Sequence, residues 1–212
     1  MDVLLDLDGT LTDNRDGIIA SVEHALSCIE EPIPDRASLL RWIGPPLKTS
    51  FETHLGSAET ADRALAFYRE RYSDTGLLEN RVYDGVPEMI EQLGALGCRL
   101  WLATSKPAVF ARRIVAHFGL DHLLDGVYGS ELDGRRSDKV DLLAHALAQI
   151  PARTAIMLGD REFDMIGARA NGCTAVGALW GFGSKAELVG SGAHYLAATP
   201  LEAAARIQEI VK

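Results

Sequence analysis

Several short runs of continuously apolar residues restrict the fold of this chain more than any other feature. Runs that are apolar throughout, without alternation, are typical of parallel strands covered on both faces. Helical patterns lie between these runs, and strand alternating with helix predicts a doubly wound parallel α/β domain. The predicted strands are residues 3–7, 99–103, 126–128, 154–158 and 174–177, and the predicted helices are residues 87–96, 106–118, 138–150, 163–170 and 200–211.

The segment of residues 14–81 breaks this alternation, because it contains helical patterns and no convincing strand. Ile18, Val22 and Leu26 share one face of its first helical pattern, as in an amphipathic helix. Such helices could merely cover the sheet, but a connection of this length needs its own core. We therefore predict a core domain, residues 1–13 and 82–212, and a small helical cap domain, residues 14–81, inserted after the first strand. Within the cap the predicted helices are residues 16–30, 47–54 and 58–78.

The charge balance limits the partners of the protein. Its 21 Lys and Arg residues stand against 30 Asp and Glu residues, a formal net charge of −9. Such a chain lacks the excess of cations that nucleic acids and anionic membranes attract, so we expect neither partner. The start of the chain has no basic stretch and no apolar run is long enough to span a bilayer, so we expect a cytoplasmic protein. The three cysteines form no zinc-binding pattern.

Two acidic residues and a glycine follow the first predicted strand. Alternation along an extended backbone puts the side chains of Asp6 and Asp8 on the same side. Gly9 then permits a tight turn and a close approach of the backbone to a ligand. Two carboxylates this close repel each other unless a cation or a proton lies between them. Acid pairs at strand ends also cap loops, so this pattern alone leaves both interpretations open.

Polar residues follow two other predicted strands, where ligands of open α/β sheets bind. Thr104 and Ser105 offer hydroxyls and backbone N–H groups to an anion, or form an ordinary helix cap before Pro107. Asp160 and Asp164 are four residues apart, which on a helix would place them one turn apart and facing the same way. Their carboxylates suit Mg²⁺; a capping acid followed by a surface acid is the alternative.

A lysine stands at the start of the helix predicted over residues 138–150. Lys139 is a cation at a helix N-terminus, where the helix dipole opposes positive charge. The position is therefore a small indication of function, although a solvated lysine is the commoner explanation.

In this order, the motifs resemble those of the haloacid dehalogenase-like superfamily of phosphatases. The matching residues are Asp6-x-Asp8-Gly9-Thr10, Thr104, Lys139 and Gly159-Asp160-x-x-x-Asp164, and the resemblance covers the whole chain, including the helical insertion. Residues 7–13, 43–47, 103–107, 128–134 and 181–184 resemble more narrowly the phosphoglycolate phosphatase-like group and its bacterial 5′-nucleotidase branch. Arg161 departs from the pattern, because many relatives carry Ser or Thr there.

The resemblance implies a role for each motif residue. Asp6 would be the nucleophile that forms an aspartyl-phosphate, and Asp8 the general acid and then the base. Mg²⁺ would bind a carboxylate oxygen of Asp6, the backbone carbonyl of Asp8, Asp160 and, directly or through water, Asp164. The phosphoryl group would be bound by Gly9, Thr104, Ser105 and Lys139.

The implied activity is a Mg²⁺-dependent phosphatase for a small phosphorylated metabolite. A nucleoside 5′-monophosphate is the preferred substrate and phosphoglycolate the close rival. A sugar-phosphate phosphatase or phosphomutase and a phosphate-binding module without activity are alternatives, whereas a dehalogenase would need neither Asp8 nor Mg²⁺. In the cap, Lys48 follows a stiff Gly-Pro-Pro loop and could reach the substrate, or could be solvated at a helix start. We expect a monomer or a weak homodimer.

Overall fold

The computed structural model describes residues 1–150 and 154–212 and divides into two compact units. The larger unit consists of Met1–Asp13 and Val82–Lys212, and the smaller one of Asn14–Arg81. The chain leaves and re-enters the larger unit through β2 (Thr12–Asp13) and β3 (Arg81–Val82), which pair with each other. Both units contain buried apolar side chains, so each has a core of its own.

A parallel six-stranded sheet with the order β5-β4-β1-β6-β7-β8 forms the middle layer of the larger unit. Its strands are β1 (Asp2–Leu5), β4 (Arg99–Pro107), β5 (Gly126–Ser130), β6 (Ala155–Gly159), β7 (Thr174–Ala178) and β8 (Tyr195–Ala197). Leu5, the last residue of β1, lies opposite Leu102 of β4 and Leu158 of β6. Residues that follow these three strands are therefore brought together at one edge of the sheet.

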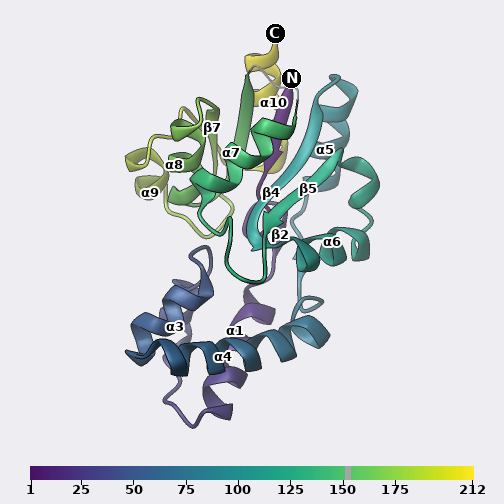
Figure 1. Cartoon of the computed structure of the whole chain (residues 1–212). Helices are drawn as coiled ribbons and strands as arrows, with labels where there is room; N and C mark the ends of the chain where they lie inside the picture. Colours follow the sequence, from purple (N-terminus) through teal and green to yellow (C-terminus); the bar gives the residue numbers. More distant parts are fainter. Residues whose placement is uncertain (151–153) are drawn as a thin grey trace. The chain divides into compact units, whose positions relative to one another are not determined.

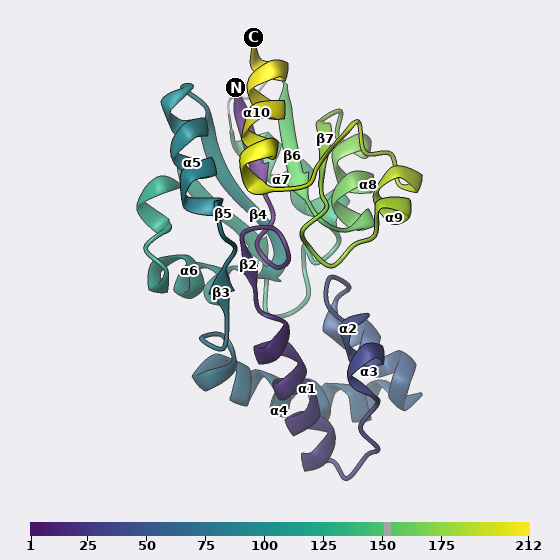
Figure 2. The same cartoon turned by 180° about the vertical axis from the view of Figure 1, so that it is seen from behind.

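Helices cover both faces of this sheet. The helices of the larger unit are α5 (Val86–Ala95), α6 (Ala108–His117), η2 (Asp121–Leu123), α7 (Lys139–Gln149), α8 (Glu162–Ala170), α9 (Lys185–Gly190) and α10 (Pro200–Val211). The pair α7 and α8 packs on one face (Figure 1), and the pair α5 and α10 packs on the other (Figure 2). The predicted doubly wound α/β fold class is thus confirmed.

The core beneath α7 and α8 explains why the strand sequences are continuously apolar. Leu4 of β1 and Met157 of β6 are completely buried against Leu143 of α7 and Met165 of α8. Each such side chain contributes roughly 1.5–3 kcal/mol when it leaves water. Because helices cover the opposite face as well, alternate strand residues cannot be polar.

The smaller unit is helical. It contains α1 (Arg15–Cys28), α2 (Arg36–Leu40), α3 (Leu47–Leu55), α4 (Ala58–Arg71) and the single π-helical turn η1 (Tyr72–Gly76). The buried stripe Ile18, Val22 and Leu26 of α1 faces inward, as its spacing predicts. The ring of Phe51 packs between those of Trp42 and Tyr68, with centroid distances of 5.2 and 6.5 Å.

Several predicted boundaries differ from the structure. The first strand ends at Leu5 rather than at residue 7, and the helix predicted over 106–118 begins only at Ala108. The helix predicted over 58–78 ends at Arg71, where the π-helical turn replaces it. The short elements α2, α9 and β8 were not predicted, because three to six residues carry little periodic signal.

Candidate active site

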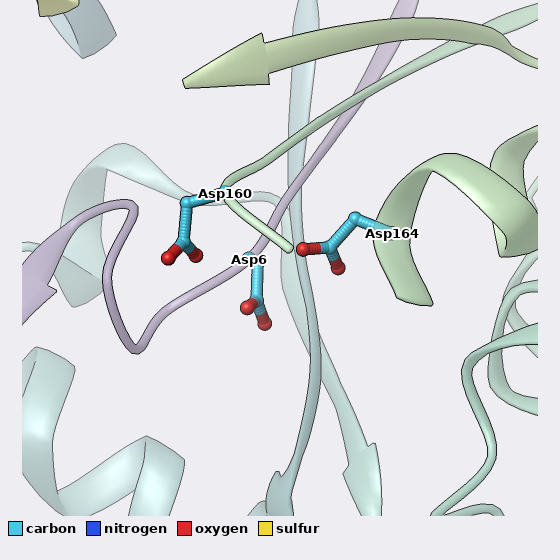
Figure 3. Close-up of side chains that lie close together, drawn as sticks. All are labelled: Asp6, Asp160 and Asp164. Atoms are coloured by element: carbon cyan, nitrogen blue, oxygen red, sulfur yellow. The ribbon is translucent and has the colours of Figure 1, made fainter. Parts of the chain in front are cut away.

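Three aspartates meet beyond the carboxyl ends of the central strands (Figure 3). Asp6 directly follows β1, Asp160 directly follows β6, and Asp164 lies in the first turn of α8. One carboxylate oxygen from each lies within 4.8 Å of the others, and all three residues are buried. Asp160 precedes α8, so the two acids of the last motif are not one turn apart on a helix. The connection between β6 and α8 brings them together instead.

Lys139 lies among these carboxylates. It is the first residue of α7, and its Nζ lies 3.0 Å from Oδ1 of Asp6 and 2.8 Å from Oδ1 of Asp164. The ammonium group also donates to the carbonyl oxygen of Ala103 at 3.1 Å. Burial alone lowers the pKa of Lys139, but the two carboxylates outweigh this effect and raise the pKa above its usual value. Lys139 therefore stays charged, and these contacts explain a cation at a helix N-terminus.

Asp160 is held tightly from several sides. Oγ1 of Thr10 donates to its Oδ1 at 3.1 Å, and the backbone N–H of Phe182 donates to its Oδ2 at 2.8 Å. Both donors are uncharged, so burial and the neighbouring carboxylates of Asp164 and Asp6 raise the pKa of Asp160 well above its usual value. Gly9, with φ +85°, passes so close that a Cβ there would lie 2.6 Å from Cγ of Asp160. Gly9 thus permits a close approach to this acid.

Asp164 is placed by the start of α8. Its Oδ2 accepts a hydrogen bond from the backbone N–H of Arg161 at 3.1 Å, while its Oδ1 contacts Lys139. Burial raises the pKa of Asp164 to about 6, against the opposing effect of the Lys139 ammonium group. A Cβ on Gly159 would collide with the Asp164 carboxylate, so the last residue of β6 must be small.

Asp8, two residues beyond Asp6, pairs with a different lysine. Nζ of Lys106 lies 2.8 Å from Oδ2 of Asp8. Lys106 is nearly buried, whereas Asp8 is partly exposed. Asp8 thus has an environment distinct from that of Asp6, and two carboxylates two residues apart interact with different cations.

Thr104 and Ser105 do not cap a helix, which corrects one of the two interpretations of this motif. Both belong to β4, and α6 begins after Pro107 without a side-chain cap. The buried Thr104 accepts, on Oγ1, a hydrogen bond from the backbone N–H of Lys106 at 3.2 Å. A hydroxyl that accepts this bond keeps its own proton for a further acceptor. The carbonyl of Ser105 accepts from Oγ of Ser130 at 2.7 Å.

The charges of the site fit a divalent cation. Four carboxylates, Asp6, Asp8, Asp160 and Asp164, face two ammonium groups, Lys106 and Lys139, which leaves a formal surplus of two negative charges. Burying such a surplus is costly unless a cation compensates it. Carboxylate oxygens are the ligands that hard cations such as Mg²⁺ prefer. The donor set therefore fits a magnesium ion held by the three buried aspartates.

The side chain of Arg161, which departs from the motif of the relatives, pairs with Glu187. Its Nε lies 2.7 Å from Oε1 of Glu187, the same oxygen that accepts from the backbone N–H of Glu162 at 3.0 Å. Although burial raises it, the pKa of Glu187 is held below its usual value by these hydrogen bonds and by the Arg161 charge. Arg161 thus ties α8 to α9.

Lys48 belongs to the smaller unit. It lies in the first turn of α3, where its exposed ammonium group lies 2.6 Å from Oδ1 of Asp62 and 3.8 Å from Oε1 of Glu52. Within its own unit Lys48 is a surface residue with acidic neighbours. A role at the substrate remains a prediction.

Sequence reasoning assigned no role to two features of the site. Lys106 was placed in a helix, so its contact with Asp8 was not predicted. Gly181 and Gly183 lie against Asp160 so closely that a Cβ on either would collide with that residue. The sequence does indicate these two glycines, because they form a Gly-x-Gly pattern shortly after β7.

Comparison with known proteins identifies the family. Residues 3–178 match the haloacid dehalogenase-like hydrolase family. The chain belongs to this family. A predicted phosphatase from Clostridium acetobutylicum has the same fold, with a TM-score of 0.94, 42% identity and coverage of 98% of each chain. The resemblance drawn from the motifs is thereby confirmed, and so is the assignment to a phosphatase-type hydrolase enzyme.

Among curated relatives, the chain is similar to a 5′-nucleotidase of Pseudomonas aeruginosa, with 48% identity over 88% of this chain and 86% of the relative. It is 42% identical to the tyrosine-protein kinase PtkA of Mycobacterium tuberculosis over 85% of this chain, but spans only 62% of that protein. A phosphoglycolate phosphatase of Colwellia psychrerythraea is 28% identical, with coverage of 85% and 84%. These relatives carry different activities in their names.

Within residues 1–150 and 154–212, no helix combines the length and the apolar character needed to cross a bilayer.

Proposed function

We propose that this enzyme is a Mg²⁺-dependent phosphomonoesterase that works through an aspartyl-phosphate, with a nucleoside 5′-monophosphate as its preferred substrate. The observation that carries the proposal is the buried group of Asp6, Asp160 and Asp164 with Lys139 among them. Asp8, two residues beyond Asp6, supplies a second carboxyl group in a separate environment. A nucleophile, a proton donor, a cation and a metal-type acid group are the parts that phosphoryl transfer requires.

The first half of the reaction forms a bond between Asp6 and phosphorus. A carboxylate oxygen of Asp6 attacks the phosphorus atom as the bond to the leaving oxygen breaks, and the proton of the Asp8 carboxyl group passes to that oxygen. In the second half the Asp8 carboxylate takes a proton from water. The oxygen of that water attacks phosphorus, and the Asp6 carboxylate is released with inorganic phosphate.

Lys139 and Thr104 stabilise the charge that shifts onto the phosphoryl oxygens. The Lys139 ammonium group already lies 3.0 Å from Oδ1 of Asp6, beside the carboxylate that attacks phosphorus. Thr104 is buried near the end of β4 and can donate its hydroxyl proton, and Ser105 follows it with a backbone N–H group. The backbone N–H of Gly9 donates to the carbonyl oxygen of Thr12 at 2.8 Å, so a contact of Gly9 with the phosphoryl group would require this hydrogen bond to open. Donors fixed in place before the reaction are effective because they need no reorganisation.

Magnesium would be held by Asp6, Asp160 and Asp164 and by the backbone carbonyl of Asp8. When bound, it would neutralise the surplus negative charge so that a phosphate dianion can approach the carboxylates. The fit rests on the surplus of two negative charges and on the oxygen donor set described above.

The preference for a nucleotide is supported by the 48% identity to a 5′-nucleotidase. Phosphoglycolate is the alternative, supported by the more distant relative of that name. We further propose that Lys48 contributes to substrate choice, that the protein is a cytoplasmic monomer or weak homodimer, and that neither nucleic-acid polymers nor membranes are partners.

Phosphate release from a substrate panel tests this proposal. The panel contains UMP, GMP, IMP, phosphoglycolate and hexose phosphates, with Mg²⁺ and with EDTA. We expect release from the nucleotides, only with Mg²⁺, and its loss in Asp6→Asn. Asp141→Asn is the matched control, because Asp141 is an exposed acid on α7.

Three results would overturn parts of the proposal. Undiminished turnover by Asp6→Asn would refute the nucleophile, and release from hexose phosphates alone would refute the nucleotide preference. Because one relative is named a tyrosine kinase, a further sample contains radiolabelled ATP and a tyrosine-containing peptide. Label on the peptide, without phosphate release from the panel, would assign a kinase instead.

A further inference from the structure

A second ion pair joins Lys106, which is buried, to Asp8, which is partly exposed and stands two residues after Asp6. The atoms Nζ and Oδ2 are 2.8 Å apart, and the side chains of Lys106 and Asp8 are 5% and 16% exposed. An ammonium group that leaves water loses its hydration, so a lysine this buried requires a charged partner. The mechanism proposed above uses Asp8 but gives the Lys106 side chain no task.

An irregularity in β4 brings Lys106 to this position. The register between β4 and β5 shifts between Thr104 and Pro107, so the two residues between them have no counterpart on β5. The backbone N–H of Lys106 donates to Oγ1 of Thr104 instead of continuing the ladder. Extra residues of this kind re-aim side chains and occur next to active sites. Here the bulge places the Lys106 ammonium group against Asp8.

The neighbouring strand holds the bulge in place. Oγ of Ser130 donates to the carbonyl oxygen of Ser105 at 2.7 Å. A Cβ on Gly129 would lie 2.7 Å from the carbonyl oxygen of Lys106, so β5 lies directly against the backbone of the bulge. Contacts within β4 and with β5 thus hold the bulge in place, and the bulge sets the position of the Lys106 side chain.

We propose that Lys106 is a positioning residue that holds the Asp8 carboxyl group in the orientation needed for proton transfer to the leaving oxygen. The inference rests on the proposed function, in which Asp8 carries that proton. When the Asp6–phosphorus bond forms and the bond to the leaving oxygen breaks, the proton moves from Asp8 to that oxygen. Lys106 keeps its own protons throughout and acts only through Asp8.

If Lys106 has this role, the effect of its loss should depend on whether the leaving oxygen needs a proton. An alkoxide leaves poorly without a proton, so the hydrolysis of an alkyl phosphate depends on Asp8. A dinitrophenolate is stable as an anion and leaves without a proton. Loss of Lys106 should therefore slow the formation of the aspartyl-phosphate from the first class of substrate and spare this step for the second.

The test compares Lys106→Met on two substrates. These are 2,4-dinitrophenyl phosphate and the alkyl phosphate that the wild-type enzyme hydrolyses best in the panel above. We expect kcat/KM, which reports the steps up to aspartyl-phosphate formation, to fall about 100-fold for the alkyl phosphate, within the range that general acid catalysis supplies, and less than about threefold for dinitrophenyl phosphate. The value of kcat is not the readout, because hydrolysis of the aspartyl-phosphate, in which Asp8 is the base, is common to both substrates. Lys185→Met is the matched control, because Lys185 is exposed at the start of α9.

A double mutant shows whether Lys106 acts through Asp8. Asp8→Asn alone should show the same selectivity for the leaving group. In the Asp8→Asn background, Lys106→Met should change kcat/KM for the alkyl phosphate by less than about twofold, because the group it positions is already absent. An independent, multiplied loss in the double mutant would overturn the inference.

The remaining outcomes are equally decisive. Equal losses on both substrates would mean that Lys106 acts on the phosphoryl group and would refute the inference. The absence of a loss on either substrate would mean that Lys106 has no catalytic role and would refute it as well. Thermal unfolding shows whether Lys106→Met folds. If it does not, Lys106→Gln is used instead; because it can still donate a hydrogen bond to Asp8, its loss should be smaller but must again fall on the alkyl phosphate and spare dinitrophenyl phosphate. An inactive wild-type enzyme would instead refute the proposed function.

Discussion

The contact between Gly9 and Asp160 makes a quantitative prediction about one methyl group. Gly9 has φ +85°, and a Cβ there would lie 2.6 Å from Cγ and 2.7 Å from Oδ1 of Asp160. Gly134 has a similar φ of +91° but no atom within 4 Å of the corresponding position. The substitutions Gly9→Ala and Gly134→Ala therefore share the backbone strain, and they differ in the steric contact.

The structure allows the free-energy cost of the backbone strain to be distinguished from that of the contact with Asp160. A left-handed backbone costs a residue with a Cβ about 1–2 kcal/mol at either position. At Gly9 the carboxylate of Asp160 must also move, yet Thr10 and Phe182 hold both of its oxygens and the residue is fully buried. Forcing such a shift adds about 1–3 kcal/mol. Each kcal/mol lowers Tm by about 2–4 °C in a chain of this size. Gly9→Ala should therefore unfold at a clearly lower temperature than Gly134→Ala.

Thermal unfolding and phosphate release together check this prediction. Gly134→Ala should keep the Mg²⁺-dependent activity of the wild-type enzyme, whereas Gly9→Ala should lose most of it, because the displaced carboxylate belongs to the group that fits the metal. Equal Tm values for the two variants, with activity retained in both, would show that the close approach of Gly9 to Asp160 is wrong.

Further predictions concern charge and burial. Adding Mg²⁺ to EDTA-treated protein should raise Tm by several degrees, because a ligand that binds only the folded state stabilises it; an unchanged Tm would contradict the metal site. Lys139→Met should lower the free energy of unfolding by about 3–5 kcal/mol in urea titrations without metal, since it leaves buried carboxylates without their cation. At pH 8 a thiol reagent should modify the exposed Cys28 rapidly, while Cys173, whose pKa burial raises to about 11, should react only after denaturation. Arg161→Ala should cost about 1 kcal/mol and spare activity, because the side chain pairs with Glu187 outside the group of aspartates; an inactive but folded variant would refute that reading.

Local patterns in the sequence were enough to predict most of the sheet. The strand predicted over 174–177 is β7, Thr174–Ala178, and the one over 154–158 is β6, Ala155–Gly159. Backbone hydrogen bonding and burial on both faces act along the whole strand, so a few apolar residues in a row reveal it. The edge strand β8 was missed, because Tyr195 at its start is exposed and the strand has only three residues.

The helix predicted from residue 106 failed for a tertiary reason. The residues before α6 are Ser105, Lys106 and Pro107, and Pro107 disfavours a helical conformation in the residue before it. Contacts with Gly129 and Ser130 then keep Ser105 and Lys106 in the extended bulge. Nothing within the segment itself indicates these contacts, which come from a strand about 25 residues away.

By itself the sequence determined which acids and cations end each strand, and therefore which residues could share a site. Asp6 and Asp160 could be named because parallel strands deliver their ends to one edge of the sheet, and Lys139 because a cation at a helix N-terminus is unfavourable without a partner. Only the tertiary structure decided which cation faces which carboxylate, with Lys139 on Asp6 and Lys106 on Asp8. The reason is physical: element formation follows from local hydrogen bonding and periodicity, whereas these pairings depend on strand register, a bulge and the close packing of glycines, which involve distant parts of the chain.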